Sequence, residues 1–314
     1  MIEVEGLTKR YGTKTAVKNL SFTVHPGTVT GFLGPNGSGK STTMRMIMGL
    51  DQATEGVARI NGKRLRDAKA PTAEIGALLD AKGIHPGRSA RNHLLALAQT
   101  NGVTTSRVDE VIDLVGLAGV ARRRAGGFSL GMGQRLGIAG ALLGNPRIVM
   151  LDEPVNGLDP EGILWIRNLL KSLAEEGRTV FVSSHLMSEM ALTAEHLIVI
   201  GRGELIADSS VEAFIGRASH NTVLVRSPQA EQLRTVLSRP EVTISSQERS
   251  VLEVSGLSSA EIGEAASAHG ITLHELAPQH ASLEEAFMEL TGDSVEYRST
   301  VSAGSQEHPK GTAS

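Results

Sequence analysis

The segment 34–42, GPNGSGKST, limits the possible folds of this chain more than any other stretch. It matches the pattern G-x-x-x-x-G-K-[ST] in full, and it lies between the apolar run VTGFL at 29–33 and a helical pattern that stops at Gly49. A strand, this glycine loop and a helix, in that order, are the context in which the pattern binds phosphate. We therefore interpret 34–42 as a phosphate-binding loop and not as a glycine turn that happens to contain lysine.

Each residue type in the loop has a physical task. Gly34 and Gly39 let the backbone approach a phosphate closely, and amide groups at the helix N-terminus point at the anion. Lys40 brings a positive charge to the β- and γ-phosphates of a nucleotide, and the Ser41 hydroxyl is a ligand for Mg²⁺. The expected nucleotide-binding residues of the loop are Gly34, Pro35, Asn36, Gly37, Ser38, Gly39, Lys40, Ser41 and Thr42.

Strand and helix patterns alternate after the loop, which predicts an α/β fold. Apolar runs at 147–151 and 179–183 read as buried strands, and Asp159-Pro160 is a typical helix start between them. Strands that alternate with helices form a largely parallel sheet with covered faces. Antiparallel β-structure is expected before the loop, and residues 88–144, mostly helical by pattern, form an expected helical subdomain.

The C-terminal third has a different organisation. The chemistry-bearing motifs end near residue 215, so we predict a first domain over 1–215. Over 222–292 the patterns read strand, helix, strand, strand, helix, strand, helix, which predicts a small α+β domain of the split βαββαβ plan with one extra helix. The tail 293–314 contains few apolar residues and is predicted to be disordered.

Composition excludes several classes of function. The chain has no cysteine, which rules out a disulfide framework, a thiolate metal site and a catalytic cysteine. A net charge of −3 provides no overall basic field for nucleic acid, and the run Arg122–Arg124 lacks interleaved aromatic residues for base stacking. No apolar run is long enough to span a bilayer, and the N-terminus lacks a signal-peptide plan. We therefore expect a cytoplasmic protein.

Two further strand ends carry polar side chains suited to phosphate chemistry. IVMLDE at 148–153 places Asp152 and Glu153 at the end of an apolar strand, where ligands bind in such sheets. Asp152 is expected to hold Mg²⁺ through its water shell, and Glu153 to orient the attacking water. His185 follows another strand and is expected to contact the γ-phosphate and orient water.

The order GPNGSGKST, FSLGMGQR, IVMLDEP, NGLDP, SSH resembles the ATPase subunit of ATP-binding-cassette (ABC) transporters over residues 1 to about 215. With SLEEAFMELTG at 282–292, the chain closely resembles the daunorubicin-resistance type, which powers drug, antibiotic-resistance and lantibiotic-immunity exporters. The resemblance implies a P-loop NTPase cassette with a mixed sheet, and ATP hydrolysis with Mg²⁺ on the cytoplasmic face of a membrane. It identifies Asp159 as the D-loop aspartate and Tyr11 as the adenine-stacking aromatic, for which stacking suits a purine.

The same resemblance implies partners. Cassettes of this family close head-to-tail over two ATP molecules, either as a homodimer or beside a different cassette, and a separate integral membrane permease moves the substrate. In FSLGMGQR, Ser129 and Gly131 keep the hydroxyl and the close backbone amide that face the γ-phosphate of the other subunit. Leu130 replaces a glycine and Met132 a polar side chain, a form similar to that of the exporter subgroup. The expected signature residues are Ser129, Gly131, Met132 and Gln134.

A second departure from the family pattern lies at 75–85, IGALLDAKGIH, where Asp80 stands in the place of a glutamine. We hypothesise that Asp80 ligates Mg²⁺ or its water and that this segment meets the membrane partner; the alternative is a solvated loop acid. We also expect the C-terminal domain to serve assembly of the complex more than nucleotide binding. The transported substrate is not encoded in these motifs, and export rests on the resemblance alone.

Two other classes compete with the transporter motor. Soluble ABC ATPases of DNA repair insert a long coiled coil between the phosphate loop and the carboxylate strand, but Lys40 and Asp152 here are separated by 152 − 40 = 112 positions without sustained heptads. Translation-type proteins carry two cassettes, and one is found here. An unrelated phosphate-loop kinase or GTPase would leave FSLGMGQR and SSH without a role.

Overall fold

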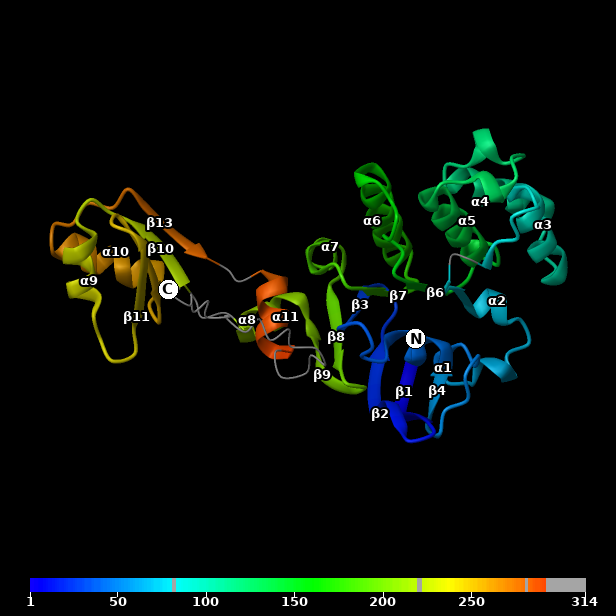
Figure 1. Cartoon of the computed structure of the whole chain (residues 1–314), viewed down its shortest axis with the longest axis horizontal. Coiled ribbons are helices and arrows are strands. Elements are labelled where there is room, and N and C mark those ends of the chain that lie inside the picture. Colours follow the sequence, from blue (N-terminus) through cyan, green and yellow to red (C-terminus); the bar gives the residue numbers. More distant parts are fainter. Residues whose placement is uncertain (81–82, 219–221, 280–281, 292–314) are drawn as a thin grey trace, which may run out of the picture.

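A six-stranded sheet organises the N-terminal two-thirds of the chain in the order β5-β6-β7-β3-β8-β9 (Figure 1). The computed structural model describes residues 1–80, 83–218, 222–279 and 282–291. Strands β3 and β5 to β8 are parallel, and β9 pairs antiparallel with β8. The predicted α/β class with a mixed sheet is confirmed. The strands are β3 (Val29–Leu33), β5 (Ile75–Leu78), β6 (Ile148–Asp152), β7 (Thr179–Ser184), β8 (His196–Gly201) and β9 (Glu204–Ser210).

A second, antiparallel sheet packs beside the first and combines two strands that precede the phosphate loop with one that follows it. Its order is β2-β1-β4, with β1 (Ile2–Tyr11), β2 (Lys14–Val24) and β4 (Glu55–Ile60). One apolar cluster joins both sheets to helix α1 (Lys40–Ile47), and at its centre the rings of Phe22, Phe32 and Phe181 lie 5.0 to 5.8 Å apart. This packing holds the start of α1 against the carboxyl ends of the parallel strands.

Helices cover the other face of the parallel sheet. The expected helical subdomain contains α3, α4 and α5, and its breaks fall at Gly102 and Gly116, which both have positive φ. Side chains cap four of the longer helices at their N-termini, because Ser89, Thr104, Ser129 and Asp159 each accept a first-turn amide. The helices of this domain are α2 (Pro71–Glu74), α3 (Ala90–Thr100), α4 (Thr105–Leu114), α5 (Leu130–Leu142), α6 (Pro160–Glu175), α7 (Met187–Thr193) and α8 (Val211–Ala218).

The C-terminal sheet forms a separate unit with its own apolar cluster, apart from the large sheets in Figure 1. Its strands are all antiparallel in the order β11-β12-β10-β13, and α9 and α10 pack on one face. The last strand of this unit, β13, begins at Glu275, and before it the backbone of Thr272 bonds to the side chains of Ser227 and Gln229. The elements are β10 (Thr222–Arg226), α9 (Ala230–Leu237), β11 (Thr243–Glu248), β12 (Val251–Ser255), α10 (Ser259–Ala268) and β13 (Glu275–Gln279).

The last helix, α11 (Leu283–Thr291), packs on a different domain from the one that we expected. We expected it within the C-terminal domain of 222–292, but it returns to the first domain and packs against α8 and α7 (Figure 1). Leu283, Ala286 and Phe287 join the apolar cluster of the parallel sheet, since burying this face there removes it from water. The predicted disordered tail, 293–314, lies outside the described residues. No helix in the described part of the chain is long and apolar enough to cross a membrane.

The packing of α11 predicts that its buried face stabilises the first domain. Phe287 is 7% exposed, whereas its neighbour Met288 is 64% exposed. Replacing Phe287 by alanine should lower the free energy of unfolding by about 3–5 kcal/mol, and Met288→Ala should change it by less than about 0.5 kcal/mol. The single tryptophan, Trp165, lies in α6, so its fluorescence during urea unfolding reports on this domain alone. Equal effects of the two variants would contradict this packing.

Candidate nucleotide site

A pocket of about 550 Å³ opens at the carboxyl ends of the parallel strands. The phosphate loop forms its floor, and Asp152 and Glu153 at the end of β6 form one wall. Its remaining wall comes from the hairpin of β1 and β2, which carries the predicted Tyr11, and from the turn between β8 and β9. Lys14, Thr15, Ala16 and Arg202 in this wall belong to no recognisable motif and were missed by sequence reasoning. The lining residues are Tyr11, Lys14, Thr15, Ala16, Pro35, Asn36, Gly37, Ser38, Gly39, Lys40, Ser41, Thr42, Asp152, Glu153 and Arg202.

The two framing glycines of the loop have no room for a side chain. A Cβ at Gly34 would lie 2.4 Å from the Ile200 carbonyl oxygen, and one at Gly39 would lie 2.6 Å from that of Ala16. Gly39 also has a φ of +106°, in the region that favours glycine. The loop therefore bends tightly, and it leaves the hydroxyl of Ser38 buried without a hydrogen-bond partner among the described residues.

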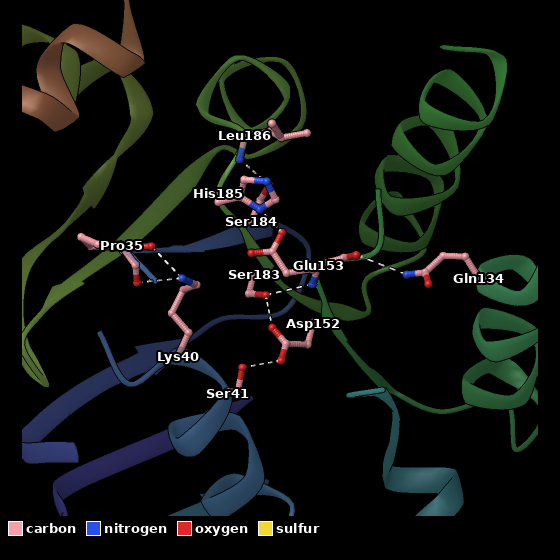
Figure 2. A network of polar contacts seen from close by, with 11 residues as sticks. Pro35, Lys40, Ser41, Gln134, Asp152, Glu153, Ser183, Ser184, His185 and Leu186 are labelled. Atoms are coloured by element: carbon pink, nitrogen blue, oxygen red, sulfur yellow. Dashed lines mark hydrogen bonds and ion pairs between the residues drawn. The ribbon is translucent and has the colours of Figure 1, made fainter. Parts of the chain in front are cut away.

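Lys40 begins helix α1 with its side chain folded back over the loop. Its ammonium nitrogen donates to the carbonyl oxygens of Gly34, at 2.6 Å, and Pro35, at 3.2 Å (Figure 2). Burial lowers the pKa of Lys40, while the nearby carboxylates of Glu153 and Asp152 offset part of that effect. A buried ammonium held by carbonyl dipoles is suited to receive an anion in the pocket.

Two hydroxyl groups hold the carboxylate of Asp152. Ser41, on α1, donates to Asp152 Oδ2 at 2.7 Å, and Ser183, at the end of β7, donates to Asp152 Oδ1 (Figure 2). Three elements thus bring oxygen atoms to one point beside the loop. Within the described residues, no group of three or more His, Cys, Asp or Glu side chains is arranged to hold a metal ion.

Glu153 and His185 form a contact across neighbouring strand ends. Glu153 Oε2 lies 2.7 Å from His185 Nδ1, and the Glu153 amide donates to Ser183 Oγ at 2.9 Å (Figure 2). Because an ionised carboxylate only accepts, Nδ1 is the donor of this pair. Glu153 has a φ of +51°, which is unusual for a residue with a side chain. Its carbonyl accepts from the buried side chain of Gln134 at 3.2 Å, a contact that sequence reasoning missed.

The signature residues lie outside this pocket. Ser129 caps α5 by accepting from the Met132 amide at 3.2 Å, so its hydroxyl is at a helix N-terminus. A Cβ at Gly131 would lie 3.0 Å from the Gly157 carbonyl, which places the signature against the turn that leads to Asp159. Asp159 itself caps α6 through the Gly162 amide at 2.9 Å. The signature and the D-loop therefore share one surface, separate from the nucleotide pocket of their own chain.

Comparison with known proteins agrees with this geometry. A profile described as "ABC transporter" matches residues 17–156. An ABC transporter ATP-binding protein of unassigned role from Bacillus subtilis (strain 168), YhcH, is 36% identical over 94% of this chain and 97% of its own length. The chain belongs to the ABC transporter family. It is the ATP-binding subunit of an ABC transporter and an ATPase, and no finding favours the soluble DNA-repair or translation alternative.

Two further comparisons describe the relatives of this ABC ATPase. The bacitracin transport ATP-binding protein BcrA of Bacillus licheniformis is 42% identical over 66% of this chain and 69% of its own length. A dimeric post-hydrolysis structure of the cassette MJ0796, bound to ADP and phosphate, aligns with a TM-score of 0.61 and 28% identity, over 67% of this chain and 98% of that chain. Residues 221–284 match a domain of unknown function.

Tyr11 and Asp80, which were expected to bind adenine and Mg²⁺ respectively, line different pockets of the ABC ATPase. Tyr11 lines the pocket with half of its surface exposed, and its hydroxyl donates to Asp51 at 3.2 Å. Asp80 does not line this pocket but a second hollow, between β5 and helices α3 and α5. Its strand, β5, pairs with β6, the strand that ends at Asp152, and Leu78 lies opposite Leu151. Ligation of Mg²⁺ or its water by Asp80 therefore stays a prediction.

Proposed function

We propose that this chain hydrolyses Mg-ATP in a closed pair of cassettes and thereby drives export of an antimicrobial compound through a separate membrane permease. The observation that carries the proposal is the convergence of Lys40, Ser41, Asp152, Glu153 and His185 at the mouth of the phosphate loop. These groups supply positive charge, metal-binding oxygen atoms and a water-orienting carboxylate in one place.

The loop fits the phosphates of ATP. The buried, unpartnered Ser38 hydroxyl and the tight bends at Gly34 and Gly39 form a cradle for an anion. The half-exposed ring of Tyr11 at the pocket rim offers a face for adenine. We assign the β- and γ-phosphates to Lys40, whose ammonium exchanges carbonyl partners for phosphate oxygens.

The oxygen atoms beside the loop fit Mg²⁺. Ser41 Oγ and Asp152 Oδ2 lie 2.7 Å apart, and a hydroxyl and a carboxylate are hard oxygen ligands. Mg²⁺ usually takes one or two such protein ligands and completes its shell with water and substrate phosphates. When bound, the metal would neutralise developing charge on the phosphates. We propose Ser41 directly, and Asp152 directly or through water, as its protein ligands.

The chemical step follows from the Glu153–His185 pair. Glu153 orients a water molecule for attack on the γ-phosphorus and accepts its proton as the bond from phosphorus to the β–γ bridging oxygen breaks, which yields ADP and phosphate. His185 holds this carboxylate through Nδ1, and in its protonated form it offers Nε2–H to the γ-phosphate. Glu153 and His185 come from different motifs because each follows a different strand, and the two strands are neighbours in the sheet.

The position of the signature supports a pair of chains. Ser129 and Gly131 lie outside the pocket of their own chain, so they would complete the pocket of another. A helix N-terminus with a small residue suits the γ-phosphate of that second nucleotide. The dimeric relative is consistent with this arrangement. We propose a homodimer, with Asp159 in the turn that lies against the signature.

The permease contact is assigned to the hollow that contains Asp80. This hollow of about 380 Å³ lies between the end of β5 and the helical subdomain, and it shares no lining residue with the nucleotide pocket. Ile84, Leu97 and Leu136 give it an apolar lining, to which a membrane subunit can dock. We propose that Asp80 marks the rim of this contact, which places the chain at the cytoplasmic face of the membrane.

An expression experiment tests the cargo. The chain and its permease are produced together in a host that is sensitive to peptide antibiotics. Bacitracin is included because one relative is named as a bacitracin transport protein. We expect the tolerated concentration to rise only when both subunits are present, and to stay at the host level with the Glu153→Gln chain. Unchanged tolerance across a panel of antibiotics, with ATP hydrolysis intact, would overturn the cargo assignment and leave the ATPase standing.

A further inference from the structure

Gln134 is a buried polar residue of the signature helix. It lies on α5, is only 4% exposed, and its amide nitrogen donates to the main-chain carbonyl of Glu153 at 3.2 Å (Figure 2). It therefore does not face another subunit from the surface of α5. It points inward, to the backbone of the carboxylate that orients water in its own chain.

The backbone that Gln134 contacts is a strained one. Glu153 has a φ of +51°, a left-handed conformation that is unfavourable for a residue with a side chain. Such conformations persist only where the surroundings hold them, and they concentrate at functional sites. Here Ser183 Oγ accepts from the Glu153 amide, and Gln134 bonds to its carbonyl. The two ends of one residue are thus held by β7 and by α5.

Helix α5 links this contact to the signature. Ser129 caps the helix and Gln134 follows five positions later, about 7.5 Å along the axis. The helix is anchored along its length, because Leu136 and Ile138 are fully buried. A shift at the Ser129 end therefore reaches Gln134 as a rigid displacement.

We propose that Gln134 is a positioning residue: its amide holds the main chain of Glu153 so that the carboxylate stays on His185 and faces the attacking water. The same bond makes the geometry of Glu153 depend on where α5 lies. When Ser129 contacts the nucleotide that is bound to a second chain, the position of α5 then fixes the Glu153 carboxylate of the first chain. The inference rests on the proposed role of Glu153, which it deepens.

The test compares two replacements of Gln134 in the purified full-length chain. Gln134→Leu keeps the approximate volume and removes the donor, and Gln134→Glu keeps the shape and replaces the donor by an acceptor. We expect each to lower kcat for ATP hydrolysis about 10- to 100-fold, the effect of a small misplacement of a reacting group. The KM for ATP should change by less than about twofold, because Gln134 does not line the pocket.

A control separates positioning from folding. Arg135 lies next to Gln134 on α5 and does not contact Glu153. Arg135→Leu removes its stacking on Trp165 and its hydrogen bond to the Val115 carbonyl. We expect it to lower the unfolding midpoint while kcat stays within about twofold of the unchanged chain. The proposal is overturned if either Gln134 variant keeps its kcat, or if Arg135→Leu loses as much. Should Glu153→Gln itself retain full kcat, the proposed function fails, whatever Gln134 does.

Discussion

Glu153→Gln is expected to lower kcat for ATP hydrolysis about 10²- to 10⁴-fold, the usual contribution of a positioned proton acceptor. The amide keeps the size of the side chain, but it cannot take the proton of the attacking water. Glu153 lies at the wall of the pocket and contacts His185 rather than the loop, so the Kd for ATP should change little. Phosphate release and equilibrium binding of a fluorescent ATP analogue measure the two quantities separately.

The same variant reports on pairing. Slow hydrolysis traps a closed state, so we expect its solution mass to double on addition of Mg-ATP. Adding Ser129→Arg to Glu153→Gln places a bulky cation on the signature surface, outside the pocket of its own chain, and should prevent doubling while ATP is still bound. A monomer in both variants would show that closure needs a different cassette or the permease, and would contradict a homodimer of the isolated chain.

Lys40→Ala is expected to raise the Kd for ATP about 100-fold, in keeping with roughly 2–5 kcal/mol for truncating one partner of a buried charged pair. The ammonium is buried over the loop, where its interaction with phosphate is weakly screened by water. Lys14→Ala provides a matched control, because Lys14 lines the same pocket but is exposed. Equal losses from the two lysines would indicate general electrostatic attraction, and would contradict a specific role for Lys40.

Much of the pocket could be predicted because its motifs are local. Lys40 and Ser41 follow a strand and open a helix, and Asp152 and Glu153 end a buried strand. Parallel strands present their carboxyl ends at one edge of the sheet, so residues that follow different strands meet there. His185 was placed by the same rule, and the structure sets it 2.7 Å from Glu153.

Other features depend on which elements pack side by side, and no local pattern encodes that. The amphipathic pattern of α11 predicts a helix, but it is equally compatible with burial against either domain. Asp80 follows β5, the neighbour of the strand that ends at Asp152, yet it lines a second hollow that is formed with α3 and α5. Gln134 was read as part of a surface motif, although its side chain is buried.

Local motifs predict the chemistry of this protein: a phosphate loop, a carboxylate pair and a histidine at strand ends, within an α/β cassette of the ABC transporter family. Only the packing shows that Gln134 contacts the main chain of Glu153, that α11 lies on the first domain, and that Asp80 lines a second hollow. Motifs act through neighbours in sequence, whereas these contacts join residues that meet only when the sheets and helices pack.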